Sequence, residues 1–155
     1  MDVYKDDLVF FSKKESNTFI IIGETILGIP KSELGTDYIY AGDRYCITLD
    51  KHLHRSIHLL LYLVNSFLMC LIIGRNFGGL SKMSIEKRKK YLNRWKNNKI
   101  PLFRTSFVTL KALSGWSIYS LEKTWEEIKY PGSPIGREDK IPTLLYGKHP
   151  WRRPQ

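Results

Sequence analysis

Residues 59–73 read LLLYLVNSFLMCLII and form the most hydrophobic stretch of this 155-residue chain. The stretch carries no charge, and Asn65 and Ser66 are its only clearly polar residues. A helix that spans a bilayer needs about 20 apolar residues, so this stretch is short for that role. We therefore predict a central helix over about residues 49–73, buried inside the protein or under a partner. A membrane-dipping helix is the alternative.

Local signals predict helices on both sides of this stretch. Ser12 is a candidate N-cap for a helix over Lys13–Leu27, which Gly28 and Pro30 end. Residues 31–50 contain Gly35, Gly42 and several Asp and Tyr residues, which indicates an irregular loop.

The second half of the chain predicts three further helices. Ser84 can cap a helix that ends near Asn97, and Pro101 suits the first turn of another, which Gly115 interrupts. A shorter helix follows over about residues 121–128. The fold class is therefore mainly α, an irregular bundle of four to five helices over residues 1–132. Residues 133–155 are rich in proline and have no helical period, so we expect an extended C-terminal strap.

The charge of the chain favours an acidic partner. The formal net charge is +10, with 25 basic and 15 acidic residues. Nucleic acid, an anionic membrane and an acidic protein surface all attract such a chain. The basic run over residues 82–99 also contains Tyr91 and Trp95, which suits contacts to phosphates and bases. Because Trp95 is in phase with Ile85 and Leu92, we favour a core position for Trp95 and a solvated basic face, and consider nucleic acid an unlikely partner.

Motifs that carry chemistry are weak in this sequence. His54 and His58 share one helix face but lack a third metal ligand nearby, so we interpret them as histidines at a solvent edge. Residues 74–79, GRNFGG, match neither a dinucleotide-binding fingerprint nor a P-loop, and indicate a helix stop and turn. Cys46 and Cys70 are too few for a structural zinc site, and Cys70 suits a buried thiol. We therefore predict no catalytic, metal or cofactor site in this chain.

Aromatic residues late in the chain are the candidates for binding a protein partner. Tryptophan and tyrosine are enriched among the residues that anchor interfaces. We expect Trp116 to lie in the core, whereas Trp125 and Trp151 suit an interface. The full set of predicted partner-binding residues is Arg75, Trp125, Tyr130, Pro131, Gly132, Tyr146 and Trp151.

About two thirds of the chain resembles a known family. The matching pieces, in chain order, are the apolar helix that ends in Gly74-Arg75, Phe77 with a glycine pair, Ser84-Ile85-Glu86-Lys87-Arg88, Ile100-Pro101-Leu102-Phe103-Arg104, and Trp125-Glu126-Glu127-Ile128-Lys129-Tyr130-Pro131-Gly132. This order is similar to the small subunits of the gluconate 2-dehydrogenase subunit 3 family. It also resembles the N-terminal helical region of long-chain fatty alcohol oxidases, which are flavoproteins of the glucose–methanol–choline type.

The resemblance implies a non-catalytic small subunit that stabilises a separate, larger flavoprotein chain. FAD would then be bound by that partner, and none by this chain. The N-terminal residues lack the basic-then-apolar order of a signal peptide, which favours the cytoplasm. A signal on the partner would carry both chains, so export or membrane association of the complex stays open.

Overall fold

The computed structural model describes residues 8–75, 78–127 and 129, and the chain divides into two compact units after Leu121. The first unit contains α1 (Lys13–Leu27), α2 (Lys31–Thr48), α3 (Lys51–Asn65), α4 (Phe67–Ile72), the 3-10 turn η1 (Leu80–Lys82), α5 (Ile85–Lys96) and α6 (Pro101–Tyr119). The second unit contributes α7 (Glu122–Glu127). The described residues include no strand, so the prediction of a mainly α fold is confirmed. They form seven α-helices, more than the four to five expected.

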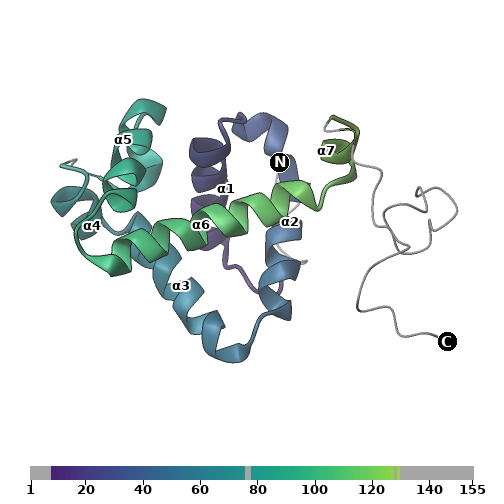
Figure 1. The fold of residues 1–155 in the computed structure, drawn as a ribbon, viewed down its shortest axis with the longest axis horizontal. Helices are drawn as coiled ribbons and strands as arrows, with labels where there is room; N and C mark the ends of the chain where they lie inside the picture. Colours follow the sequence, from purple (N-terminus) through teal and green to yellow (C-terminus); the bar gives the residue numbers. More distant parts are fainter. Residues whose placement is uncertain (1–7, 76–77, 128, 130–155) are drawn as a thin grey trace, which may run out of the picture. The chain divides into compact units, whose positions relative to one another are not determined.

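Helix α1 is the centre of the first unit and packs against α2, α3, α5 and α6 (Figure 1). Its predicted bounds are confirmed. The Ser12 hydroxyl and the Glu15 carboxylate form a reciprocal capping box, and Gly28 ends the helix with a left-handed φ of 74°. Phe19 and Ile22 are fully buried on the face that meets the other helices.

The predicted loop over residues 31–50 is wrong, because these residues form α2. Gly35 has a φ of 64° and kinks the helix near its start. Gly42 lies where a Cβ atom would come within 2.5 Å of the Phe19 ring. Both glycines weaken a helix locally, but the kink and the close packing on α1 require them.

The prediction of one helix over residues 49–73 is wrong in one respect. These residues form two helices, α3 and α4. Ser66 adopts an extended conformation after α3 and caps α4, with its hydroxyl accepting a hydrogen bond from the Met69 amide at 3.2 Å. The preceding Asn65 accepts a hydrogen bond from the Leu80 amide at 3.1 Å. The two polar residues of the apolar run therefore mark its break.

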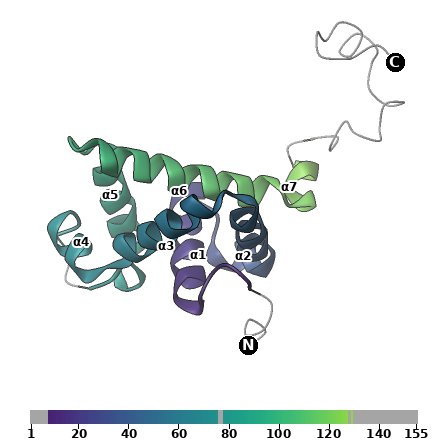
Figure 2. The same ribbon diagram turned by 90° about the horizontal axis from the view of Figure 1, so that it is seen from below.

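Helix α6 is longer than expected, since it continues through Gly115 to Tyr119. Figure 2 shows it running along one side of the first unit, where it packs on α1, α2 and α5. Its buried face carries Leu110, Leu113 and Ile118. The indole of Trp116 lies on another face and is exposed, so its predicted core position is wrong.

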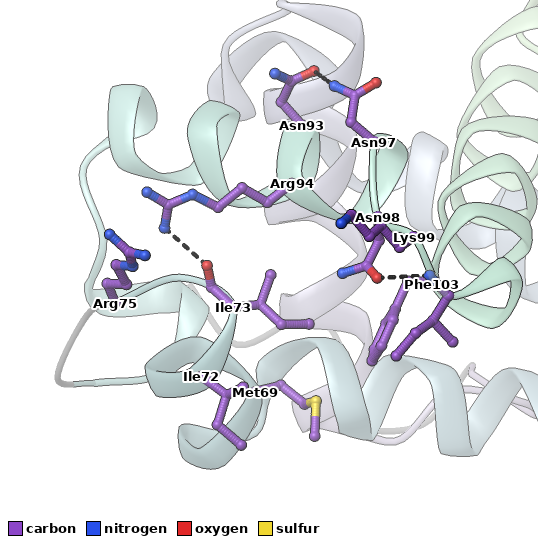
Figure 3. Close-up of a pocket in the computed structure, with 11 residues that line it drawn as sticks. Met69, Ile72, Ile73, Arg75, Asn93, Arg94, Asn97, Asn98, Lys99 and Phe103 are labelled. Atoms are coloured by element: carbon purple, nitrogen blue, oxygen red, sulfur yellow. Dashed lines mark hydrogen bonds between the residues drawn. The ribbon is translucent and has the colours of Figure 1, made fainter.

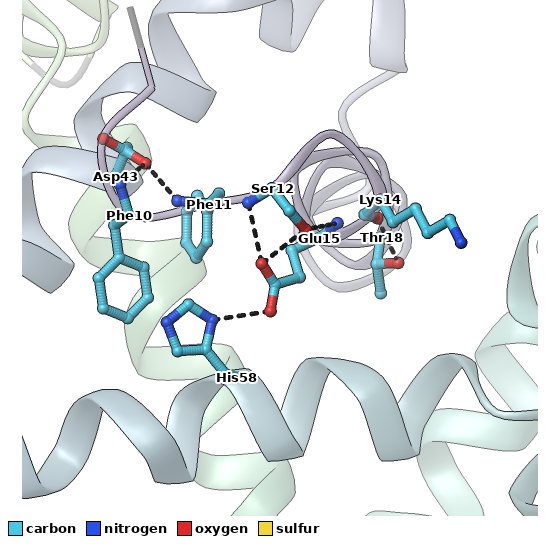
Figure 4. Close-up of polar contacts among 8 residues, drawn as sticks. All are labelled: Phe10, Phe11, Ser12, Lys14, Glu15, Thr18, Asp43 and His58. Carbon is cyan, nitrogen blue, oxygen red and sulfur yellow. Dashed lines mark hydrogen bonds and ion pairs between the residues drawn. The ribbon is translucent and has the colours of Figure 1, made fainter.

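The residues before α1 are fastened to α2 by one carboxylate (Figure 4). Asp43 is buried, and its Oδ1 accepts hydrogen bonds from the Phe10 amide at 3.0 Å and the Phe11 amide at 2.7 Å. Its Oδ2 accepts a third from the Val9 amide at 3.0 Å. Asp43 thus satisfies three backbone donors and holds the Phe11 ring against Phe19.

Glu15 links the start of α1 to α3. Its Oε1 lies 2.7 Å from Nδ1 of His58, and Oε2 accepts hydrogen bonds from the Ser12 amide and hydroxyl at 2.9 and 2.7 Å (Figure 4). Partial burial raises the pKa of Glu15, but the hydrogen bonds from Ser12 and the interaction with His58 outweigh it, so the pKa lies below 4.5. The ionised form is therefore the one that stabilises the fold.

We expect Glu15→Gln to remove part of the acid sensitivity of the fold. Because the pKa of Glu15 is lower in the folded state, its contribution is present above the unfolded pKa near 4.5 and is lost as the pH falls through the folded value. Urea denaturation at several pH values between about 5 and about 3 measures this. The free energy of unfolding should fall more steeply for the wild type than for Glu15→Gln, and equal slopes would contradict the assignment.

Both cysteines are buried free thiols, as predicted for Cys70. Burial, helped by the Asp43 carboxylate, raises the pKa of Cys46 to about 12, and burial also raises the pKa of Cys70. Thiolate is the reactive form, so neither cysteine should react with maleimides at neutral pH.

None of the helices in the described residues has the length and apolar character needed to cross a bilayer.

Candidate functional site: an apolar groove between α3 and α6

An open groove of about 540 Å³ separates α3 from α6 in the first unit. Both helices pack on α1 (Figure 2), and the groove lies between them. The residues that line it are Tyr45, Leu49, Leu53, Ser56, Ile57, Leu59, Leu60, Leu63, Trp95, Leu102, Phe103, Thr105, Ser106, Val108, Thr109, Ala112, Leu113 and Trp116. Among these described residues, none carries a charge.

Some of the lining residues on each helix follow a heptad spacing. On α3 they include Leu53, Ser56, Leu60 and Leu63, at steps of three, four and three residues. On α6 they include Leu102, Thr105, Thr109, Ala112 and Trp116, at steps of three, four, three and four residues. This spacing is the one by which a helix presents a continuous seam to a neighbouring helix. Two such seams face the same empty groove.

Aromatic side chains occupy the two ends of the groove. Tyr45 and Trp116 are stacked at one end, with ring centroids 5.3 Å apart. Trp95 and Phe103 meet edge to face at the other end, with centroids 5.0 Å apart. Ala112 and hydroxyl residues lie between these ends. Their side chains are small, so another helix can approach closely in the middle of the groove.

The rims of the groove project into solvent. Leu59 is 56% exposed, Val108 is 61% exposed and Trp116 is 60% exposed. Exposed apolar groups that line one continuous surface mark interaction sites. A small ligand is normally enclosed on most sides, whereas these lining residues stay more than half exposed and suit a macromolecular surface.

The polar groups of the groove are suited to binding. Ser56, Thr105, Ser106 and Thr109 contribute hydroxyls, and the Thr109 hydroxyl donates to the Thr105 carbonyl at 3.1 Å. Such hydroxyls donate and accept hydrogen bonds but carry no charge near neutral pH. The groove therefore offers an apolar contact surface with a few orienting hydrogen bonds.

The residues predicted to bind a partner do not gather in this groove. Arg75 follows α4, has a left-handed φ of 54°, and lines a different pocket. Trp125 is half-buried in α7, in the second unit. Tyr130, Pro131, Gly132, Tyr146 and Trp151, together with the predicted strap, lie outside the described residues.

Sequence reasoning identified one side of the groove and missed the other. One side belongs to the apolar helix predicted over residues 49–73, where Leu59, Leu60 and Leu63 line the groove. The side formed by α6 was missed because the sequence predicted only a helix that begins at Pro101, and not which of its faces stays exposed. The heptad spacing from Leu102 to Trp116 was the available signal.

The basic run on α5 differs from an aromatic nucleic-acid surface. Tyr91 and Trp95 are buried, as the helical phase predicted for Trp95, and the Tyr91 hydroxyl donates to the Val64 carbonyl at 2.9 Å. Burial raises the pKa of Tyr91. Arg88 forms an ion pair with Glu24 at 2.7 Å. The aromatic rings of the run thus stabilise the core and do not face solvent.

His54 and His58 are half-buried, and each contacts another residue of the fold. Nε2 of His54 lies 2.9 Å from the Leu49 carbonyl, and Nδ1 of His58 lies 2.7 Å from Glu15. Within the part of the chain that the structure describes, no three His, Cys, Asp or Glu side chains come together as a metal site.

Comparison of the chain with protein-family models, with curated proteins and with solved structures finds no match. The resemblance to the gluconate 2-dehydrogenase small subunits therefore stays a prediction, and the apolar groove is the feature on which a function can be argued.

Proposed function

We propose that this chain is a non-catalytic accessory subunit whose α3–α6 groove receives an amphipathic helix of a larger partner chain. The observation that carries the proposal is the pair of heptad seams facing one uncovered groove. A third helix laid between them would complete the packing that α3 and α6 begin. The chain would thereby stabilise its partner and be stabilised by it.

The groove dimensions fit one helical segment. The seam on α6 runs from Leu102 to Trp116, which corresponds to about 21 Å of helix at 1.5 Å per residue. A partner helix of roughly 14 residues would cover it. Its large apolar residues would pack on the stacked Tyr45–Trp116 pair, and its small residues would face Ala112.

Charge favours a different chain over a second copy as the occupant. Each copy carries a formal net charge of +10, so two copies repel each other. An acidic partner would instead be attracted. The family resemblance suggests a flavin-containing oxidoreductase of the glucose–methanol–choline type as that partner, with FAD bound in its own chain.

Affinity isolation of the chain from its native cells, at low and high salt, tests the proposal. We expect one larger protein to co-elute in a salt-resistant complex, and absorbance in the flavin bands would identify it as a flavoprotein. If the larger partner contained no flavin, the accessory role would stand, but the proposal that the partner is a flavoprotein would be rejected. Isolation of the chain only as a homodimer, or only with nucleic acid that high salt removes, would reject the accessory role itself.

A further inference from the structure

A second surface lies at the corner where α4 approaches the α5–α6 connection. A pocket of about 960 Å³ opens there, between Met69, Ile72 and Ile73 on one side and residues 97–100 on the other (Figure 3). The groove described above does not use these residues, apart from Phe103, which lines both.

The charged groups that line this corner are all basic. Arg75, Arg94 and Lys99 line the pocket, and no acidic residue of the described chain is among its lining residues. Arg94 is fixed in place by donating to the Ile73 carbonyl at 2.8 Å (Figure 3). It also donates to the Gly74 carbonyl at 2.8 Å. Its charge is not neutralised by these bonds, and Arg75 and Lys99 are exposed and form no ion pair with a described residue.

Apolar side chains project into solvent beside these cations. Ile72 is 62% exposed and Leu68, one helical turn earlier on α4, is 57% exposed. Ile100, on the other side of the pocket, is 54% exposed. The first unit thus places aliphatic residues from two separate segments at one basic corner.

We propose that this corner binds the surface of a membrane that contains anionic lipids. Arg75, Arg94 and Lys99 would contact lipid phosphates or carboxylates, while Leu68, Ile72 and Ile100 enter the boundary between headgroups and acyl chains. Protruding aliphatic residues beside cations match the two requirements of interfacial binding, apolar insertion and attraction to anionic lipid.

The side chains favour a membrane over nucleic acid as the anionic surface. Nucleic acids that are bound as single strands stack on free aromatic rings. The aromatic ring in this pocket, Phe103, is half-buried against Trp95. The side-chain amide of Asn97 donates to Asn93 at 3.0 Å, and the Asn98 side chain accepts from the Ile100 backbone amide at 2.9 Å. These two side chains therefore have fewer free hydrogen-bonding groups for reading bases.

Vesicle flotation with the full chain tests this inference. Vesicles of phosphatidylcholine with phosphatidylserine are compared with vesicles of phosphatidylcholine alone. We expect binding to the anionic vesicles, and about a 25-fold weaker binding for Arg75→Gln/Lys99→Gln, because each cation near the surface contributes roughly fivefold. Leu68→Ser/Ile72→Ser should weaken binding to the same vesicles about tenfold or more by removing apolar insertion.

Lys87→Gln/Lys90→Gln provides the matched control, because it removes the same charge from exposed positions of α5 that do not line the pocket. This control should retain nearly all of the binding, and circular dichroism should show the wild-type helix content in every variant. An equal loss of vesicle binding in Arg75→Gln/Lys99→Gln and in Lys87→Gln/Lys90→Gln would overturn the site in favour of unspecific charge attraction. The proposal of membrane binding would be overturned if the chain did not float with anionic vesicles. It would also be overturned if the chain bound only an oligonucleotide, through Arg75 and Lys99.

Discussion

The Ala112→Glu chain should bind its partner about a hundredfold more weakly than the wild type. Ala112 is exposed in the free chain and lies in the middle of the α6 seam, where the partner helix would cover it. A carboxylate at this position would be buried without a partner, which costs about 3 kcal/mol, and each 1.4 kcal/mol corresponds to tenfold in affinity. Titration calorimetry with the isolated partner measures the change.

Lys111→Glu is the matched control for this experiment. Lys111 is the preceding residue of α6, is exposed and does not line the groove. Its replacement changes the net charge by two units, more than Ala112→Glu does, yet it should alter affinity only a few-fold through the rim. A larger loss for Lys111→Glu than for Ala112→Glu would show that net charge, and not the groove, determines binding.

Asp43→Ala should be the most destabilising single substitution that we predict, by about 3 kcal/mol or more in the free energy of unfolding. The buried carboxylate accepts hydrogen bonds from the amides of Val9, Phe10 and Phe11. Hydrogen bonds to a charged acceptor contribute more than neutral ones, and a buried donor left without a partner costs about 1–3 kcal/mol. Release of this segment would also withdraw the buried Phe11 ring from Phe19.

Asp43→Asn and Asp37→Ala separate this explanation from a general effect on α2. Asparagine keeps the shape and one acceptor oxygen but turns its NH2 group toward one of the backbone amides, which is also a donor. The free energy of unfolding of Asp43→Asn should therefore lie between those of the wild type and Asp43→Ala. Asp37 is exposed on the same helix, and its replacement by alanine should change stability by no more than about 0.5 kcal/mol. Urea denaturation measures all three. A loss at Asp37 as large as that at Asp43 would contradict the role of the three amide bonds.

The elements predicted correctly are those whose signals are local. Ser12 caps α1 and Gly28 ends it, as predicted. Pro101 begins α6 at its first turn. Helix α2 was missed because its sequence contains residues that weaken an isolated helix. Gly42 and Asp43 are explained only by Phe19 and by the amides before α1, which lie more than twenty residues away in sequence.

The groove was only half predictable for a similar reason. The apolar excess of residues 59–73 can be read directly, but which face of α6 is buried depends on where α2 packs. Trp116 is apolar enough for the core, yet it stacks on Tyr45 at the surface because Leu113 and Ser117 take the buried positions beside it. The predicted aromatic anchors Tyr146 and Trp151 lie outside the described residues.

Site-specific photo-crosslinking shows whether a helix of a larger partner lies in the groove. Thr105→Cys, in the α6 seam, and Lys14→Cys, on the exposed start of α1, can each be labelled with a benzophenone maleimide, because Cys46 and Cys70 are buried. We expect position 105 to crosslink to one helical segment of one larger protein, and position 14 not to crosslink to it. Crosslinks of equal yield from both positions, or from position 105 only to a second copy of this chain, would contradict it.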